Sequence, residues 1–231
     1  SSIARATDSG SYIHVGPEIG VASTKAFTGQ VTVLSMLALT LARLKGTIAE
    51  DTFVRMVQGL QAIPDKIKEV LDHADAIADL SKIFTYAHNF IYLGRGYNYP
   101  AALEGALKLK EISYLHAEAY PAGEMKHGPI ALLDKELPVV ALVPKNDLWE
   151  KTISNIEESM ARKSPIIALA TEGDTEIGHY TQNVIFTPET EPELFPFVAV
   201  VPLQLFAYYI ARQRGCDIDM PRNLAKSVTV E

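Results

Sequence analysis

Two glutamates, a lysine and a histidine that lie close together in the sequence are the residues best suited to chemistry. Glu104, Lys108 and Glu111 share one segment with a helical pattern, and His127 follows sixteen residues after Glu111. At about 100° per residue, a helix places the first three side chains within about 60° of one another, as one charged stripe. Carboxylate, amine and imidazole groups can accept and return protons, so this spacing indicates acid–base chemistry.

Apolar residues flank this charged stripe on both sides of the expected helix. An ordinary surface helix has one apolar stripe and one broad polar face, so charges enclosed in this way favour the wall of a cleft. The alternative is that Glu104, Lys108 and Glu111 form solvated ion pairs, each stabilising the helix by only about 0.2–0.5 kcal/mol. The helix by itself leaves both interpretations open.

The composition is typical of a soluble globular protein that has room for one domain and part of another, with 231 residues, 48% of them hydrophobic and 21% charged. The net charge of −7 lacks the basic footprint of a nucleic-acid-binding protein, so we expect no nucleic-acid partner. Any anionic substrate must then be held by local groups. The single cysteine, Cys216, excludes an intrachain disulfide and suits a reducing compartment, which predicts a cytoplasmic protein.

The most apolar stretch, residues 194–210, raises the question of a membrane span. Two prolines and Gln204 interrupt it, so a buried helix of an α/β core is the better interpretation and we expect no membrane partner. The first ten residues lack the charged and apolar regions of a signal peptide. They also begin without a helix or turn signal, which indicates a domain cut from a longer polypeptide.

Short β-rich runs alternate with helical patterns along the chain. The expected strands are residues 12–15, 89–93, 138–143, 165–170 and 183–186. The expected helices are residues 22–45, 100–114, 147–162 and 194–214. This alternation predicts an α/β fold, with a doubly wound parallel sheet covered by helices on both faces.

The pattern divides the chain into four parts. Residues 1–48 hold one expected strand and one helix, as the C-terminal part of a truncated first domain would. Residues 49–80 show helical periodicity broken at Pro64, and are expected to form a helical connector. Residues 81–215 hold four expected strands and form a nearly complete second domain, followed by a C-terminal tail at 216–231.

The turn Gly94-Arg95-Gly96 lies between an expected strand and an expected helix. In a doubly wound sheet such turns are where ligands bind, and a helix N-terminus favours anions. The turn lacks the third glycine of a dinucleotide-binding fingerprint. A plain tight turn is an equally good interpretation.

Separate blocks at residues 16–28, 92–113, 117–129 and 219–231 closely resemble the glutamine:fructose-6-phosphate amidotransferase family, the glucosamine-6-phosphate synthases. The resemblance covers nearly the whole chain and corresponds to the back part of the sugar isomerase (SIS) half. It implies the SIS fold, with one nearly complete SIS domain and the C-terminal part of a preceding one. It also implies ketose–aldose isomerisation with amination, through a Schiff base and a proton shuttle.

The same resemblance implies roles for individual residues. Glu111 corresponds to the base that moves a proton between the first two sugar carbons, and Lys226 to the Schiff-base lysine. His127 corresponds to the ring-opening group, and Lys108 to its neighbour assisting at the sugar hydroxyls. The family contacts the sugar at the positions of Val21, Ser23 and Ala225, and lines its ammonia route at Arg222.

Elementary chemistry supports these implied roles. A proton shuttle between adjacent carbons needs a carboxylate that can take and return the proton, and Glu111 between apolar flanks fits. A Schiff-base lysine must be neutral to attack, and Lys226 would be desolvated if the tail closes over the cleft. Histidine exchanges protons near neutral pH, as opening a sugar ring requires. Alternatively, His127 caps a turn and Lys226 is a solvated tail residue.

The resemblance further implies sugar-phosphate ligands, fructose 6-phosphate and glucosamine 6-phosphate, a glutaminase domain in the parent chain, and a homodimer in which the histidine reaches the neighbouring site. We expect no cofactor, and no metal because the other histidines lack a second ligand at metal-binding spacing. The family's phosphate-binding loops are absent from this sequence. The fragment alone is therefore expected to be inactive or weakly active.

Two other classes remain open at this point. The chain could belong to a sugar-phosphate-sensing regulatory module, because one fold serves both binding and catalysis. It could also belong to a phosphosugar isomerase or deglycase that does not use glutamine. The first of these predicts that Glu111 and Lys226 are dispensable.

Overall fold

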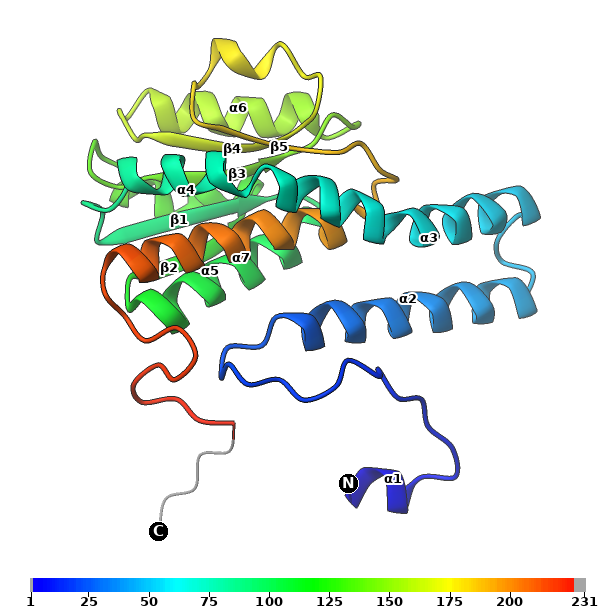
Figure 1. Cartoon of the computed structure of the whole chain (residues 1–231). Helices are drawn as coiled ribbons and strands as arrows, with labels where there is room; N and C mark the ends of the chain where they lie inside the picture. The colour runs from blue at the N-terminus through cyan, green and yellow to red at the C-terminus, as the bar shows by residue number, and fades with distance from the viewer. Residues whose placement is uncertain (1, 227–231) are drawn as a thin grey trace.

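A computed structural model describes residues 2–226 and shows a parallel sheet between two layers of helices (Figure 1). The strands are β1 (Asn89–Gly94), β2 (His116–Pro121), β3 (Val139–Val143), β4 (Ile166–Thr171) and β5 (Val184–Thr187). The spatial order of the sheet is β2-β1-β3-β4-β5, and every pair is parallel. This is the doubly wound α/β fold that the sequence predicts.

Helices lie before, between and after the strands. They are α1 (Ser2–Ala6), α2 (Lys25–Leu44), α3 (Glu50–Asp72), α4 (Ala74–Ile83), α5 (Asn98–Ser113), α6 (Trp149–Met160) and α7 (Phe195–Gln213). Three short 3₁₀ helices complete the set, η1 (Ala122–His127), η2 (Pro129–Leu132) and η3 (Ile177–His179). Helices α4, α5 and α7 cover one face of the sheet and α6 covers the other (Figure 1).

The alternation of side chains along each strand explains the two layers. Tyr92, Val140 and Leu142 point into the cluster beneath α5 and α7, whereas their neighbours Val139 and Ala141 point into the cluster beneath α6. All residues of β3 and β4 are buried, as continuous apolar runs in a doubly covered parallel sheet should be. The core therefore fixes the position of α5, which carries the charged stripe.

Two strand predictions were wrong. The run at residues 12–15 contains no strand, because this part of the chain lies between α1 and α2 with no neighbouring strand to pair with. Strand β2 was missed, because it is an edge strand whose residues beyond Ala117 are only half-buried and which carries the polar Glu118. A partly solvated edge strand gives a weak apolar pattern.

Pro64 does not break the connector as predicted. Helix α3 runs without interruption from Glu50 to Asp72, with Pro64 exposed in its interior. Met56, Ile63 and Val70 are buried at seven-residue intervals along it. Their packing on both sides of the proline offsets the lost backbone hydrogen bond, which costs about 3 kcal/mol.

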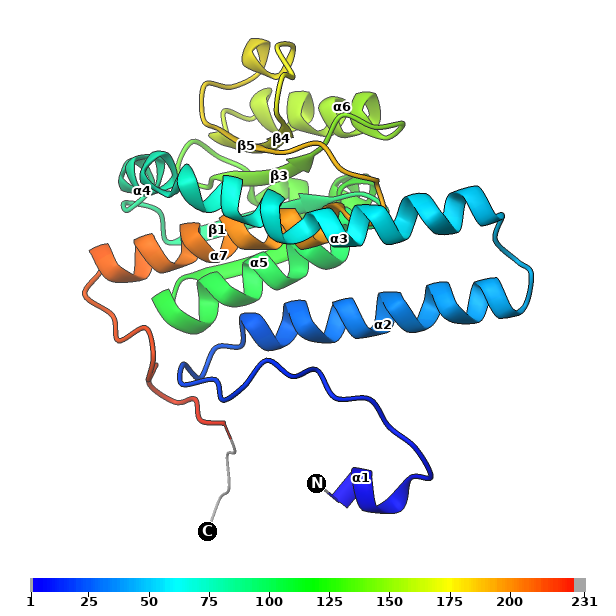
Figure 2. The same cartoon turned by 45° about the vertical axis from the view of Figure 1, so that its right-hand side comes forward.

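Two helices, α2 and α7, are long and apolar enough to cross a membrane by length and composition. Helix α7 is a core helix of this fold, with 61% of its most apolar window buried, as expected for residues 194–210. Helix α2 is mostly exposed in the described structure, and Leu39 is its one buried residue. Figure 2 shows α2 beside α3, on the same side of the molecule as the N-terminal segment and the residues that follow α7.

Candidate functional site

In the charged stripe on α5, Lys108 is buried and the two glutamates are partly buried. The Lys108 side chain is 4% exposed, and its Nζ lies 2.6 Å from Oε2 of Glu111 and 3.5 Å from Oε1 of Glu104. Burying an ammonium group without partners is strongly unfavourable, so the two carboxylates are what allow Lys108 to occupy this position. The three side chains are therefore not the fully solvated ion pairs of the alternative interpretation.

Close packing of α5 against α7 explains how the stripe is enclosed. At Gly105, a Cβ atom would lie 2.7 Å from Cδ1 of Leu203 on α7, so only glycine allows this approach. Burial raises the pKa of Glu104, although the charge and hydrogen bond of Lys108 lower it. Glu104, one turn before Lys108, is thus the carboxyl group of this stripe whose pKa burial clearly raises.

A second charged cluster joins the two ends of the chain. Nζ of Lys226 donates to Oε2 of Glu18 at 3.2 Å, and the hydroxyl of Ser23 donates to the same oxygen at 3.2 Å. The other oxygen, Oε1 of Glu18, accepts the backbone N–H of Thr24 at 2.8 Å. Residues separated by about 200 positions in sequence therefore meet at the beginning of α2.

The pKa of Glu18 is about 2. Burial raises it, but hydrogen bonds from the Thr24 backbone, Lys226 and other donors together lower it. The position at the N-terminus of α2, where the helix dipole favours negative charge, acts in the same direction. Glu18 was not among the predicted site residues. Its sequence signal was an acidic residue seven positions before the helix start, which is too weak to identify a partner in the distant tail.

A cavity of about 310 Å³ connects the two clusters. Lys108 and Ile112 of α5, Gln204 and Tyr208 of α7, and Glu18 line it, together with the tail residue Asp219. The backbone N–H of Val21 donates to the carbonyl of Asp219 at 2.9 Å, which ties the N-terminal loop to the tail. The cavity walls therefore come from three stretches of sequence.

The structure brings most of the other predicted site residues to this region. Arg222 lies in the tail, where its backbone N–H donates to the hydroxyl of Tyr114 at 2.8 Å and its guanidinium carbon lies 4.3 Å from the ring centroid. Ala225 is exposed beside Lys226. The rest of the tail, residues 227–231, lies outside the described residues.

His127 is the exception. It is exposed at the end of η1, which follows the carboxyl end of β2, whereas Glu111 lies in the last turn of α5 and precedes the amino end of β2. The two residues thus lie toward opposite ends of the parallel strands within one chain. Within one copy of this chain, His127 is not part of the Lys108 cluster.

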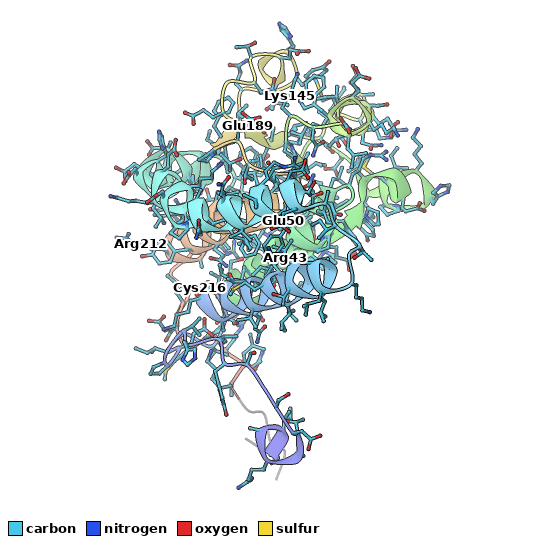
Figure 3. The ribbon with its side chains drawn as sticks, turned by 90° about the vertical axis from the view of Figure 1, so that its right-hand side faces the viewer. Arg43, Glu50, Lys145, Glu189, Arg212 and Cys216 are labelled. Atoms are coloured by element: carbon cyan, nitrogen blue, oxygen red, sulfur yellow. The ribbon has the colours of Figure 1, made fainter. Side chains whose placement is uncertain are left out.

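No group of three or more metal-ligating side chains comes together among residues 2–226. Cys216 lies just after α7 (Figure 3). Its sulfur lies 3.8 Å from the carbonyl of Ser113. It packs against the same end of α5 as the tail.

The fold and this site define an α/β domain of the sugar isomerase class. The SIS domain profile matches residues 83–212, more than half of the chain. The chain therefore belongs to the SIS domain family.

Comparison with individual known proteins shows which members of this family the chain is similar to. The whole chain is 67% identical to part of a glutamine–fructose-6-phosphate aminotransferase (isomerizing) of Bacteroides thetaiotaomicron and 53% identical to that of Thermus thermophilus. It spans 38% of the length of each. Among solved structures, the C-terminal domain of glucosamine-fructose-6-phosphate aminotransferase from Francisella tularensis superimposes with a TM-score of 0.90 at 40% identity, covering 95% of this chain and 62% of that one.

Proposed function

We propose that this chain is the isomerase part of an enzyme that makes glucosamine 6-phosphate from fructose 6-phosphate and glutamine. The observation that carries the proposal is the buried Lys108–Glu111 pair facing a cavity that the Lys226 tail helps to enclose. The full-length similarity to aminotransferases of that name supports it. It also favours this activity over a sugar-sensing module or an isomerase that does not use glutamine.

The proposed sequence of steps uses the residues of both clusters. The amine of Lys226 attacks the C2 carbonyl of the open-chain ketose and water leaves, which gives a Schiff base. Ammonia then displaces the lysine amine and leaves an imine at C2. Glu111 takes a proton from C1 and returns a proton to C2, while the C1 hydroxyl loses its proton and the nitrogen gains one. The imine and C1 alcohol thereby become an amine and an aldehyde. Lys108 holds the Glu111 carboxylate in place through their hydrogen bond at 2.6 Å.

The contact between Lys226 and Glu18 has a consequence for the first step. A carboxylate with a pKa of about 2 is too weak a base to remove a proton from an amine at neutral pH. Glu18 therefore holds Lys226 in a resting position, and the amine must leave this contact before it attacks. Val21, Ser23 and Ala225 would contact the sugar, and Arg222 would line the ammonia route.

The remaining parts of the proposal concern the parent protein. Residues 1–48 would complete a first SIS domain, 49–80 connect it to the second domain at 81–215, and 216–231 form the tail that closes the site. The parent chain would carry a glutaminase domain, act in the cytoplasm and form a homodimer. His127, which lies toward the opposite end of the strands from Glu111, would open the sugar ring in the partner's site.

Glucosamine 6-phosphate formation by the full-length protein that contains this chain tests the proposal. Replacing Glu111 by Gln removes the proton shuttle, so kcat should fall by about 10²–10⁴-fold, the usual contribution of general acid–base catalysis. Glu172→Gln, an exposed control just after β4, should leave kcat unchanged. A wild-type protein that forms no product, or a Glu111→Gln protein with the original kcat, would reject the proposed function.

A further inference from the structure

Tyr114, the residue that caps the C-terminus of α5, has a backbone conformation that tyrosine rarely adopts. Its φ is 61° and its ψ is 18°, in the left-handed region where helix ends usually carry glycine. A bulky residue is strained there, and such strain persists only where surrounding contacts hold it in place. The contacts of the Tyr114 side chain therefore indicate why this helix ends on tyrosine.

The Tyr114 side chain holds one residue of the C-terminal tail by two contacts. Its hydroxyl accepts the backbone N–H of Arg222 at 2.8 Å, and the guanidinium carbon of the same residue lies 4.3 Å from the centroid of its ring. A hydrogen bond and a cation–π contact thus act together. They fix both the main chain and the side chain of Arg222, which lies four residues before Lys226.

The chain that follows α7 passes the same end of α5 (Figure 2). Nε of Arg214 donates to the carbonyl of Ser113, the last residue of α5, at 3.3 Å. The carboxylate of Asp217 accepts two backbone N–H groups of the turn that follows it, at 3.1 and 2.9 Å. These contacts bring the tail to Tyr114, but all of them involve residues before Arg222.

Beyond Arg222 the tail is attached at one place. Residues 223–226 are exposed, and the one hydrogen bond that these described residues make with a segment outside the tail joins Lys226 to Glu18. In the proposed first step, the amine must leave Glu18 before it attacks the sugar. The contact of Tyr114 with Arg222 is then the nearest hydrogen bond that restricts where the amine can go.

The length of free chain decides how much this contact matters. Four residues lead from Arg222 to Lys226, so the Cα atom of Lys226 stays within about 14 Å of Arg222. Without this contact, the nearest hydrogen bond from the tail to another segment joins the Asp219 carbonyl to the N–H of Val21, seven residues before Lys226. The reach then grows to about 24 Å and the accessible volume about fivefold, which dilutes the amine at the sugar by about the same factor.

We propose that Tyr114 is a positioning residue for Lys226. By anchoring the tail at Arg222, it keeps the Lys226 amine close to the sugar between the release of this amine from Glu18 and its attack on the C2 carbonyl. Tyr114 acts here through the tail and not through contact with the substrate. The inference rests on the proposed function, and it gives the end of α5 a task separate from proton transfer at Glu111.

Two measurements on the full-length protein that contains this chain test the anchor without reference to activity. In hydrogen–deuterium exchange, the Arg222 amide should exchange about tenfold faster in Tyr114→Phe, which loses the hydrogen bond and keeps the ring. Trypsin should cleave after Arg222 faster in Tyr114→Gly, which also loses the ring but suits the left-handed backbone. Tyr86→Phe changes an exposed tyrosine before β1, and this matched control should leave both rates unchanged.

The rate of borohydride trapping of fructose 6-phosphate at Lys226 tests the consequence for the first step. At saturating sugar this rate should fall by about fivefold in Tyr114→Gly and by about twofold in Tyr114→Phe. The sugar concentration that gives half the maximal rate should stay within about twofold of wild type, because Tyr114 positions the amine and does not bind the sugar. If Tyr114 only ended the helix, glycine would relieve its strain and the trapping rate would be retained.

The outcomes separate this proposal from the proposed function. Circular dichroism will establish that each variant keeps the wild-type fold, and Tyr114→Phe guards against misfolding of Tyr114→Gly. Unchanged exchange at Arg222 in Tyr114→Phe, or an unchanged trapping rate in variants whose tail is released, would overturn the positioning role. A wild-type protein that forms neither the adduct nor glucosamine 6-phosphate rejects the proposed function instead, and the exchange rates still decide whether Tyr114 anchors the tail.

Discussion

The two ends of α5 differ in how they are built. At its amino end, the cavity next to Asn98 is formed mainly by turns of one sheet and the helices that follow them. At its carboxyl end, the cavity next to Lys108 needs the loop that contains Glu18, helices α5 and α7, and the tail that contains Asp219. The position of the first cavity follows from sheet topology, whereas the second cavity forms only when segments far apart in the sequence meet.

The charged side chains at the two ends of α5 also differ in burial and in their partners. Lys108 is almost completely enclosed and is balanced by Glu104 and Glu111, so its removal leaves carboxylates in a poorly solvated place. Arg95 is half-buried and is held by an amide. Removing a charge at the carboxyl end of α5 should therefore lower stability more than removing one at the amino end.

Lys108→Met should give the largest change and tests this difference. Removing one partner of a buried ion pair leaves an uncompensated charge, so the free energy of unfolding should fall by about 3 kcal/mol at neutral pH. Urea denaturation measures this change. Lys110→Met, an exposed neighbour on the same helix, is the matched control and should stay within about 0.5 kcal/mol of wild type. Equal stability of the two variants would show that the charges around Lys108 are solvated after all.

Glu18→Gln should change the free energy of unfolding by a smaller amount, and this change should depend on pH. Because the pKa of Glu18 is lowered to about 2 from 4.5, its stabilising contribution is fully present above pH 4.5 and is lost as the pH falls toward 2. The difference in unfolding free energy between wild type and Glu18→Gln should therefore decrease through this range. Carbon-13 NMR of the Glu18 carboxyl group should show a midpoint near pH 2. A midpoint near 4.5 would mean that Lys226 and the Thr24 backbone do not hold it.

The sequence was sufficient to predict the helices and strands whose burial is continuous or strongly periodic. Strands β3 and β4 are apolar runs buried on both faces, and α5 and α7 were recognised near their observed bounds. Strand β2 was missed because an edge strand with Glu118 half in solvent lacks that pattern. The isolated run at residues 12–15 was mistaken for a strand because β-rich composition alone does not supply a partner strand.

The candidate site was only partly predictable for a related reason. The charged stripe of α5 depends on helical spacing, which the sequence shows directly. The contact between Glu18 and Lys226 depends on how the two ends of the chain fold together, which no local pattern encodes. The turn of residues 94–96 was recognised as a possible ligand position. Its large cavity also required the glutamate-rich loop after β5, which is distant in sequence.

Covalent trapping of the substrate tests most directly the claim that the tail completes a catalytic site at the carboxyl end of α5. The full-length protein that contains this chain would be incubated with fructose 6-phosphate and borohydride, and the reduced adduct located by mass spectrometry. We predict one sugar phosphate attached to Lys226, its loss in Lys226→Ala, and unchanged labelling in Lys82→Ala, an exposed control on α4. Labelling that persists in Lys226→Ala at another lysine would contradict the account.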